Sequence, residues 1–181
     1  MNSSNKKYKT IVMDPPWNIK PIVLKCRPNL TKIPYKTMTD EEIISFPIND
    51  YTDNECVLFM WTTMTYLPLA LKICNLWGFK YHATLAWDKT NGRTMFGIKR
   101  NVEFVIVCYK GKLLMKETGK SIHACFKEPT MVHSQKPRIF YDMLLNSTYE
   151  PRIDIFSRRK HIGFDSYGDQ AEEPLTLHSF E

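Results

Sequence analysis

An acid, two prolines and an aromatic residue, Asp14-Pro15-Pro16-Trp17, directly follow the β-favouring run at residues 8–13. The Asp14 carboxylate and the Pro15 carbonyl, which Pro16 holds in place by restricting the backbone before it, can accept the two hydrogens of a base's exocyclic amine. Trp17 offers a stacking face, worth about 1–3 kcal/mol per base in nucleic-acid sites. A tight turn with a half-buried aromatic residue explains the same four residues, so the tetrad alone leaves both interpretations open.

Seven further blocks follow the tetrad in the order typical of one family. They are PYKTMTDEEI at residues 34–43, LFMWT at 58–62, LWGF at 76–79, WDKT at 87–90, RNVE at 100–103, HSQKP at 133–137, and FSR with GFDSYGDQ at 156–158 and 163–170. From about Tyr8 to Gln170 the chain therefore resembles the adenine N6-methyltransferases that carry a DPPW tetrad. That family includes the catalytic subunit of the mRNA adenine-methylation complex and many bacterial and phage DNA adenine methyltransferases.

The resemblance implies S-adenosyl-L-methionine as the cofactor and proposes residues to hold it. Lys136 matches the lysine that pairs with the cofactor's carboxylate, although a lysine at a helix start can also be simply solvated. Asp154 matches an acid that binds ribose hydroxyls, as acids near strand ends do in such folds. Arg158 and Gln170 match groups that contact the ribose and methionine parts. Asp169 replaces the usual asparagine, and its carboxylate can accept a hydrogen bond but cannot donate one.

The resemblance also implies residues that handle the adenine. Tyr35 stands where the family has an aromatic gate, although a loop tyrosine can equally cap the core. Arg100, Asn101 and Glu103 match a turn near the target base, and the Asn101 carboxamide can pair with an adenine edge or serve the turn itself. Basic residues on the neighbouring loops either contact phosphates or are solvated; they are Lys20, Lys25, Arg27, Arg93, Lys99 and Arg100.

Strand-like and helical segments alternate along the chain, which indicates an α/β fold. Thr39 before acids, Gly78 after an apolar stretch and Pro137 in a first turn are typical helix-boundary signals. The patterns predict strands at residues 9–13, 55–62, 80–89, 103–110 and 152–156, and helices at 39–46, 64–77 and 136–146. The resemblance implies a Rossmann-like, S-adenosylmethionine-dependent methyltransferase sheet with permuted motif order: base-binding half first, cofactor half last. Ligands then lie at the carboxyl ends of the strands.

The remaining segments are predicted to be loops or ends. Residues 18–36, 91–99 and 113–129 are each long enough to form a lid. The chain is predicted to be one catalytic domain over residues 1–181, with 1–7 and 171–181 peripheral. No G-x-G-x-x-G follows a strand, so the usual dinucleotide fingerprint is missing.

Composition excludes several classes of protein. The 181 residues suit one domain with a sizeable core. Because no stretch approaches ~20 apolar residues and no signal peptide is evident, we expect a cytoplasmic protein with no membrane partner. The resemblance to stand-alone family members favours a bacterial or phage origin. Five widely spaced cysteines predict reduced core thiols rather than disulfides or a zinc site, and no metal is expected. The net charge of +6 favours a polyanionic partner.

These observations predict an enzyme that methylates the 6-amino group of adenine in nucleic acid. DNA is favoured over RNA, because a stand-alone catalytic domain resembles the bacterial and phage members. The alternatives are an RNA methyltransferase and a catalytically silent, nucleic-acid-binding subunit; the tetrad together with Lys136 argues against the latter. The sequence leaves open whether the chain acts alone, as a homodimer or with a partner subunit.

Overall fold

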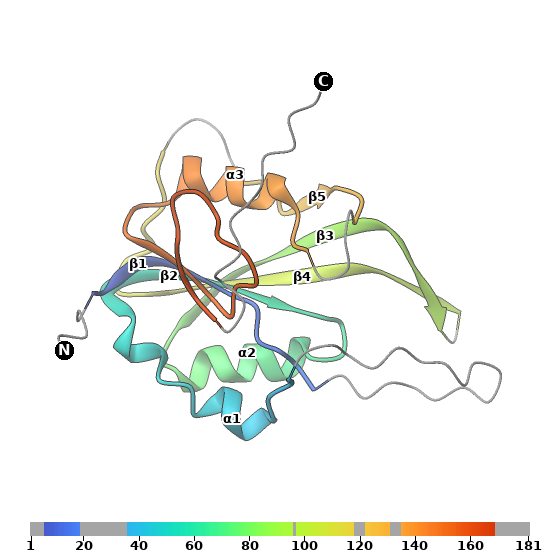
Figure 1. Cartoon of the computed structure of the whole chain (residues 1–181), viewed down its shortest axis with the longest axis horizontal. Coiled ribbons are helices and arrows are strands. Elements are labelled where there is room, and N and C mark those ends of the chain that lie inside the picture. Colours follow the sequence, from blue (N-terminus) through green and yellow to red (C-terminus); the bar gives the residue numbers. More distant parts are fainter. Residues whose placement is uncertain (1–5, 19–35, 96, 118–121, 131–134, 169–181) are drawn as a thin grey trace.

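Seven strands form a single sheet in the order β5-β3-β4-β2-β1-β6-β7 within the described part of the chain (Figure 1). The computed structural model describes residues 6–18, 36–95, 97–117, 122–130 and 135–168. The strands are β1 (Tyr8–Met13), β2 (Thr52–Thr62), β3 (Lys80–Met95), β4 (Ile98–Lys110), β5 (Cys125–Lys127), β6 (Arg152–Ile155) and β7 (Asp165–Tyr167). This is the α/β, Rossmann-like fold that the sequence predicts.

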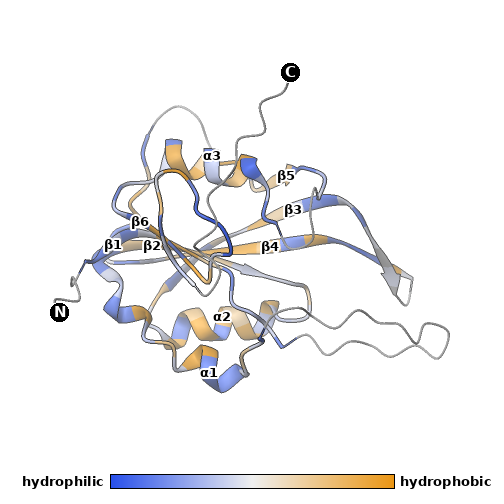
Figure 2. Ribbon diagram, in the orientation of Figure 1, coloured by the Kyte–Doolittle hydropathy of each residue, from blue (hydrophilic) through white to orange (hydrophobic). Residues whose placement is uncertain are grey.

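Helices cover both faces of the sheet. On one side lie α1 (Asp40–Ile44), the short 3-10 helix η1 (Ile48–Asp50) and α2 (Leu67–Leu76), and on the other lies α3 (Arg138–Ser147). Strand β1 serves both layers because its side chains alternate: Ile11 and Met13 pack into the α1 and α2 core, and Val12 packs into the α3 core. Hydrophobic and hydrophilic residues alternate along α2 and α3 (Figure 2), and the buried residues of these helices include Ile73 and Leu144.

Local sequence signals fix the helix ends. Thr39 and Glu42 form a reciprocal capping box at the start of α1. Gly78, with φ of 79°, follows α2 in the left-handed conformation that glycine adopts without strain. Helix α3 begins after Pro137, and the Glu128 carboxylate accepts hydrogen bonds from the first two backbone N–H groups of that helix, both at 3.1 Å. All three helices are shorter than the sequence predicts.

Strands β2, β1, β6 and β7 run parallel to one another, whereas β4 runs antiparallel to β2 and β3. The carboxyl ends of β1 and β6 therefore lie at the same edge of the sheet, with Met13 paired to Ile155. Asp14 follows β1, and Arg158 follows β6 closely. This edge is where doubly wound sheets bind ligands.

The prediction of a loop at residues 91–99 is wrong. Strands β3 and β4 continue through it as a two-stranded ribbon that extends beyond the sheet (Figure 1), with Arg93 paired to Arg100 and Met95 to Ile98. Asn91-Gly92 resembles a turn in sequence, but Gly92 lies beside a register shift. A Cβ there would approach the Arg100 carbonyl oxygen to 2.5 Å, so the glycine serves close backbone approach.

Two short strands, β5 and β7, have no counterpart in the sequence prediction. Strand β5 interrupts the predicted loop at residues 113–129 and pairs with β3, and β7 completes the edge beside β6. Within the predicted peripheral segment 1–7, Lys6 forms an ion pair with Asp165 at 2.5 Å. Most of the predicted lid at 18–36, together with the tail 171–181, lies outside the described residues.

Candidate functional site

The tetrad forms a tight backbone structure at the carboxyl end of β1. The Asp14 N–H donates to the Ile155 carbonyl at 3.3 Å, the Trp17 N–H donates to the Pro15 carbonyl at 2.8 Å, and the Met38 N–H donates to the Pro16 carbonyl at 2.9 Å. A carbonyl oxygen has two lone pairs. The Pro15 carbonyl, on the residue after Asp14, therefore keeps one acceptor position.

The Trp17 ring is more enclosed than an open stacking face would be. Only 3% of Trp17 is exposed, its indole N–H donates to the Trp61 carbonyl at 3.1 Å, and its ring stacks on Tyr66 with 5.0 Å between centroids. Tyr66 was not among the predicted site residues, because in the sequence it was only one aromatic residue of the helix predicted at 64–77. Stacking of a base on Trp17 stays a prediction and requires Tyr66 to yield that face.

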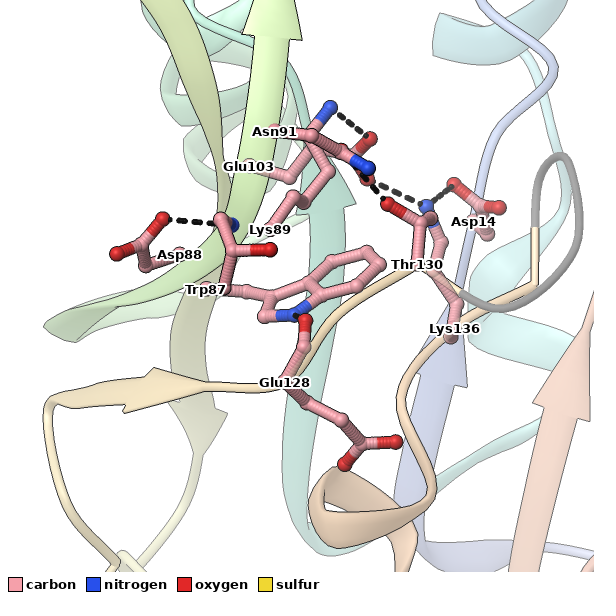
Figure 3. Close-up of polar contacts among 10 residues, drawn as sticks. Asp14, Trp87, Asp88, Lys89, Asn91, Glu103, Glu128, Thr130 and Lys136 are labelled. Atoms are coloured by element: carbon pink, nitrogen blue, oxygen red, sulfur yellow. Dashed lines mark hydrogen bonds and ion pairs between the residues drawn. The ribbon is translucent and has the colours of Figure 1, made fainter.

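Four alternating charges form a chain beside the tetrad, which we call the ion-pair chain: Asp14, Lys136, Glu103 and Lys89 (Figure 3). The Lys136 Nζ lies 3.1 Å from an Asp14 oxygen and 3.0 Å from a Glu103 oxygen, and the Lys89 Nζ lies 3.0 Å from the other Glu103 oxygen. Lys136 also lies over the Trp61 ring, 4.6 Å from its centroid. Glu103, expected to handle the base, thus contacts two lysines.

Burial and charge set the ionisation of this chain. Burial raises the pKa of Asp14, and the neighbouring Lys136 and Arg158 oppose that rise only in part. Burial acts the same way on Glu103, but Lys136 and Lys89 outweigh it, and the Glu103 pKa is lowered. For Lys136, the two carboxylates outweigh burial and raise the pKa. Asp14 is therefore the less strongly stabilised carboxylate of the two.

The other two residues of the predicted substrate turn make local contacts. The Asn101 amide donates to the Asp88 carboxylate at 2.8 Å, and the Thr90 N–H donates to the same oxygen at 2.8 Å. These bonds lower the Asp88 pKa and brace the register shift at the base of the ribbon. Arg100 is exposed and donates to the Thr65 hydroxyl at 3.2 Å. The Asn101 side chain thus makes a local contact within the β3–β4 pair, and its pairing with an adenine edge stays a prediction.

Asp154, in strand β6, lies in a buried polar cluster with Tyr141 and His161. It is 2% exposed, it accepts a hydrogen bond from the Tyr141 hydroxyl at 2.8 Å, and it lies 3.8 Å from His161 Nε2. The His161 ring stacks on Tyr141 at 3.5 Å. Burial raises the Asp154 pKa to about 7 and lowers the His161 pKa to about 4. Contact of Asp154 with a ribose stays a prediction, and the sequence analysis did not anticipate Tyr141 as its partner.

Several predicted site residues lie outside the described part of the chain, namely Tyr35, Asp169, Gln170, Lys20, Lys25 and Arg27. Among the described residues, no group of three or more His, Cys, Asp or Glu side chains could hold a metal ion. In the same residues, no helix is long and apolar enough to cross a membrane. Three described cysteines are buried and unpaired, and Cys125 is exposed, which corrects its assignment to the core.

Comparison with known proteins identifies similar chains. The MT-A70 family model matches residues 8–170. The Type II methyltransferase M.MunI of Mycoplasma sp is 24% identical over 180 residues, which cover 90% of this chain and 77% of M.MunI. The human N(6)-adenosine-methyltransferase catalytic subunit METTL3 is 26% identical over 167 residues, which cover 86% of this chain and 26% of METTL3. A probable N(6)-adenosine-methyltransferase MT-A70-like protein of Oryza sativa subsp. japonica is 28% identical over 177 residues, 23% of its length. The chain thus spans about a quarter of these two eukaryotic relatives.

Proposed function

This chain belongs to the MT-A70 family, and from that premise we propose that it transfers a methyl group from S-adenosyl-L-methionine to the 6-amino group of adenine in nucleic acid, with DNA favoured. The observation that carries the proposal is the Asp14 carboxylate at the carboxyl end of β1, beside the Pro15 carbonyl and within ion-pair distance of Lys136. Relatives named as N(6)-adenosine-methyltransferases support the chemistry. M.MunI, named as a Type II methyltransferase and matched over 77% of its length, supports methyl transfer.

The residues near Asp14 fit such a cofactor in charge. Lys136 supplies a buried cation for an amino-acid carboxylate, and the positive charge of Arg158 acts on the same acid. Gly168, directly after β7, lies against the segment after β6, because a Cβ on this glycine would come within 2.7 Å of the Ser157 carbonyl oxygen. Lys136, Arg158, Asp169 and Gln170 would hold the cofactor, with Asp154 toward its ribose.

When bound, S-adenosyl-L-methionine supplies an electrophilic methyl group on a sulfonium centre. Asp14 and the Pro15 carbonyl accept hydrogen bonds from the amine, and these bonds strengthen as the nitrogen becomes tetrahedral and positively charged. The raised pKa of Asp14 suits it to take the proton that the methylated nitrogen then loses. Trp17, Tyr35, Arg100, Asn101 and Glu103 complete the proposed base-handling set, in which Glu103 acts through Lys136.

Nucleoside analysis tests the proposal. The protein is incubated with labelled S-adenosyl-L-methionine and either DNA or RNA of the same base sequence, and the nucleic acid is then digested to nucleosides. We expect label in N6-methyldeoxyadenosine. Label only in N6-methyladenosine from RNA would overturn the choice of DNA. If neither nucleic acid is labelled although the protein binds both, the assignment as an enzyme is overturned. The alternative of a catalytically silent, nucleic-acid-binding subunit is then favoured.

A further inference from the structure

The two carboxylates that share Lys136 are held unequally. Glu103 contacts two ammonium groups, Lys89 and Lys136, each at 3.0 Å. Asp14 lies 3.1 Å from the same Lys136. The Glu103 pKa is lowered and the Asp14 pKa is raised. The Glu103 contact is therefore the stronger of the two, and the Asp14 contact is the one that a competing anion would displace.

The anchored end of the chain is part of the sheet. Glu103 on β4 and Lys89 on β3 come from paired strands, with Glu103 opposite Trp87. Lys136 precedes α3, whose first N–H groups are tied to Glu128, and its ammonium rests over the buried ring of Trp61. With only 14% of its side chain exposed, Lys136 has little room to move as a whole. A change of partner is the smaller rearrangement.

We propose that Glu103 and Lys89 are positioning residues that anchor Lys136, so that the ammonium can exchange Asp14 for the cofactor's carboxylate and release Asp14 to the adenine amine. This inference rests on the proposed function and extends it. Exchange keeps the buried ammonium of Lys136 paired with two carboxylates throughout, which avoids the large penalty of leaving that ammonium unpaired. An acid paired to an ammonium is also a weaker acceptor for an amine.

The consequence is positive coupling between two ligands. Cofactor binding frees an acceptor for adenine, so each ligand strengthens binding of the other by the same factor. The coupling requires the carboxylate on one ligand and the 6-amino group on the other. Binding measurements detect it without any methyl transfer.

The experiment measures affinity for a fluorescein-labelled DNA that is methylated in the nucleoside assay. Dissociation constants are compared without cofactor, with saturating S-adenosylhomocysteine, and with saturating 5′-methylthioadenosine, which has the nucleoside but lacks the carboxylate. We expect S-adenosylhomocysteine to tighten DNA binding at least about fivefold, within the usual range of coupling, and methylthioadenosine to leave it unchanged. Replacing the target adenines by purine, which lacks the amino group, should abolish the effect. Equal tightening by both nucleosides, or none by either, overturns the inference.

Variants separate positioning from simple structural support. Glu103→Gln removes the anchoring charge, so Lys136 stays on Asp14. The ratio of the dissociation constant for DNA without cofactor to that with S-adenosylhomocysteine should then fall toward one. Lys89→Met, at a half-buried side chain, should lower the ratio in part and serves if Glu103→Gln fails to fold. Lys127→Met on exposed β5 is the matched control and should keep the parent ratio. Unchanged ratios in both test variants would overturn the roles assigned here. Methylation with uncoupled binding defeats this inference alone, whereas absence of methylation defeats the proposed function.

Discussion

Asp14 carries the proposed chemistry, and a single change of atom tests it. Asp14→Asn keeps the shape but replaces an acceptor oxygen by an amide that can donate to the amine. We predict that methyl transfer to adenine falls at least about a hundredfold, because lost electrostatic stabilisation of this kind commonly costs ~2.7–4 kcal/mol. Single-turnover assays measure the effect, with circular dichroism as the control for folding. Transfer at the parent rate would contradict the role given to Asp14.

His161 and Asp154 are expected to affect stability in opposite directions as pH changes. Asp154, with its pKa raised to about 7, favours the folded state below pH ~4, and that benefit is lost as pH rises to 7. His161, with its pKa lowered to about 4, favours the folded state above pH ~6.5, and that contribution to stability is lost as pH falls from 6.5 to 4. Across this window the two effects largely cancel.

His161→Phe should expose the Asp154 effect while keeping a ring to stack on Tyr141. We predict that the free energy of unfolding of this variant falls between pH 4 and 7 more steeply than that of the parent. Urea titrations at four pH values measure it. Asp154→Asn is the control and should show the opposite trend, a rise between pH 4 and 6.5. If the free energy of unfolding depends on pH in the same way in all three proteins, the opposing contributions of Asp154 and His161 are ruled out.

The β3–β4 ribbon is the element that projects from the site, and its surface predicts contact with phosphates. Lys99 and Arg100 are exposed along it, and residues 89–102 contain four basic residues and no acidic one. If they neutralise phosphates, log affinity for DNA should fall with log salt by about 0.9 per phosphate. Replacing Lys99 and Arg100 by Gln should flatten that slope by up to about two phosphates' worth.

Filter-binding or fluorescence titrations at several salt concentrations measure the slope of each protein. Lys72→Gln is a suitable control, because this exposed lysine lies on α2 and removes one charge away from the ribbon. A slope near zero in the parent would leave the +6 charge as a matter of solubility. An equal slope in the double variant would move the phosphate contacts away from the ribbon.

Across the whole molecule, the proposed site joins segments far apart in the sequence. Asp14 lies near one end of the chain, Glu103 lies past its middle, and Lys136 and Arg158 lie in its last third. A ligand that binds them must stabilise the folded state, by about 2.7 kcal/mol at a hundred times its dissociation constant. We predict this gain in free energy of unfolding with S-adenosylhomocysteine.

Lys136→Ala should weaken the binding of S-adenosylhomocysteine by about 1.5–3 kcal/mol, the usual contribution of a hydrogen bond to a charged group. Calorimetry gives the dissociation constants, and thermal unfolding shows the smaller stabilisation at equal ligand concentration. Lys112→Ala, at an exposed site, should bind as the parent does. An unchanged dissociation constant for Lys136→Ala would leave that lysine as part of the ion-pair chain only.

The amino-acid sequence by itself determined the family and the α/β class. Both rest on ordered motifs and on hydrophobic patterns that depend on near neighbours, such as the strand before Asp14 and the cap at Thr39. The family is confirmed by the match over residues 8–170, and the fold by the sheet. The roles of Asp14, Lys136 and Arg158 stay predictions.

Only the tertiary structure decided which of these residues meet. Glu103 contacts Lys136 because β4 lies beside β2 in the sheet and the Lys136 ammonium lies over Trp61 of β2. The two residues are 33 positions apart in the chain. Tyr66 covers Trp17, and Tyr141 binds Asp154, for the same reason. Residues 91–99 were predicted to be a loop because the continued pairing of β3 with β4, with its register shift, depends on the opposite strand. Contacts of this kind arise from packing between distant segments, which no local pattern records.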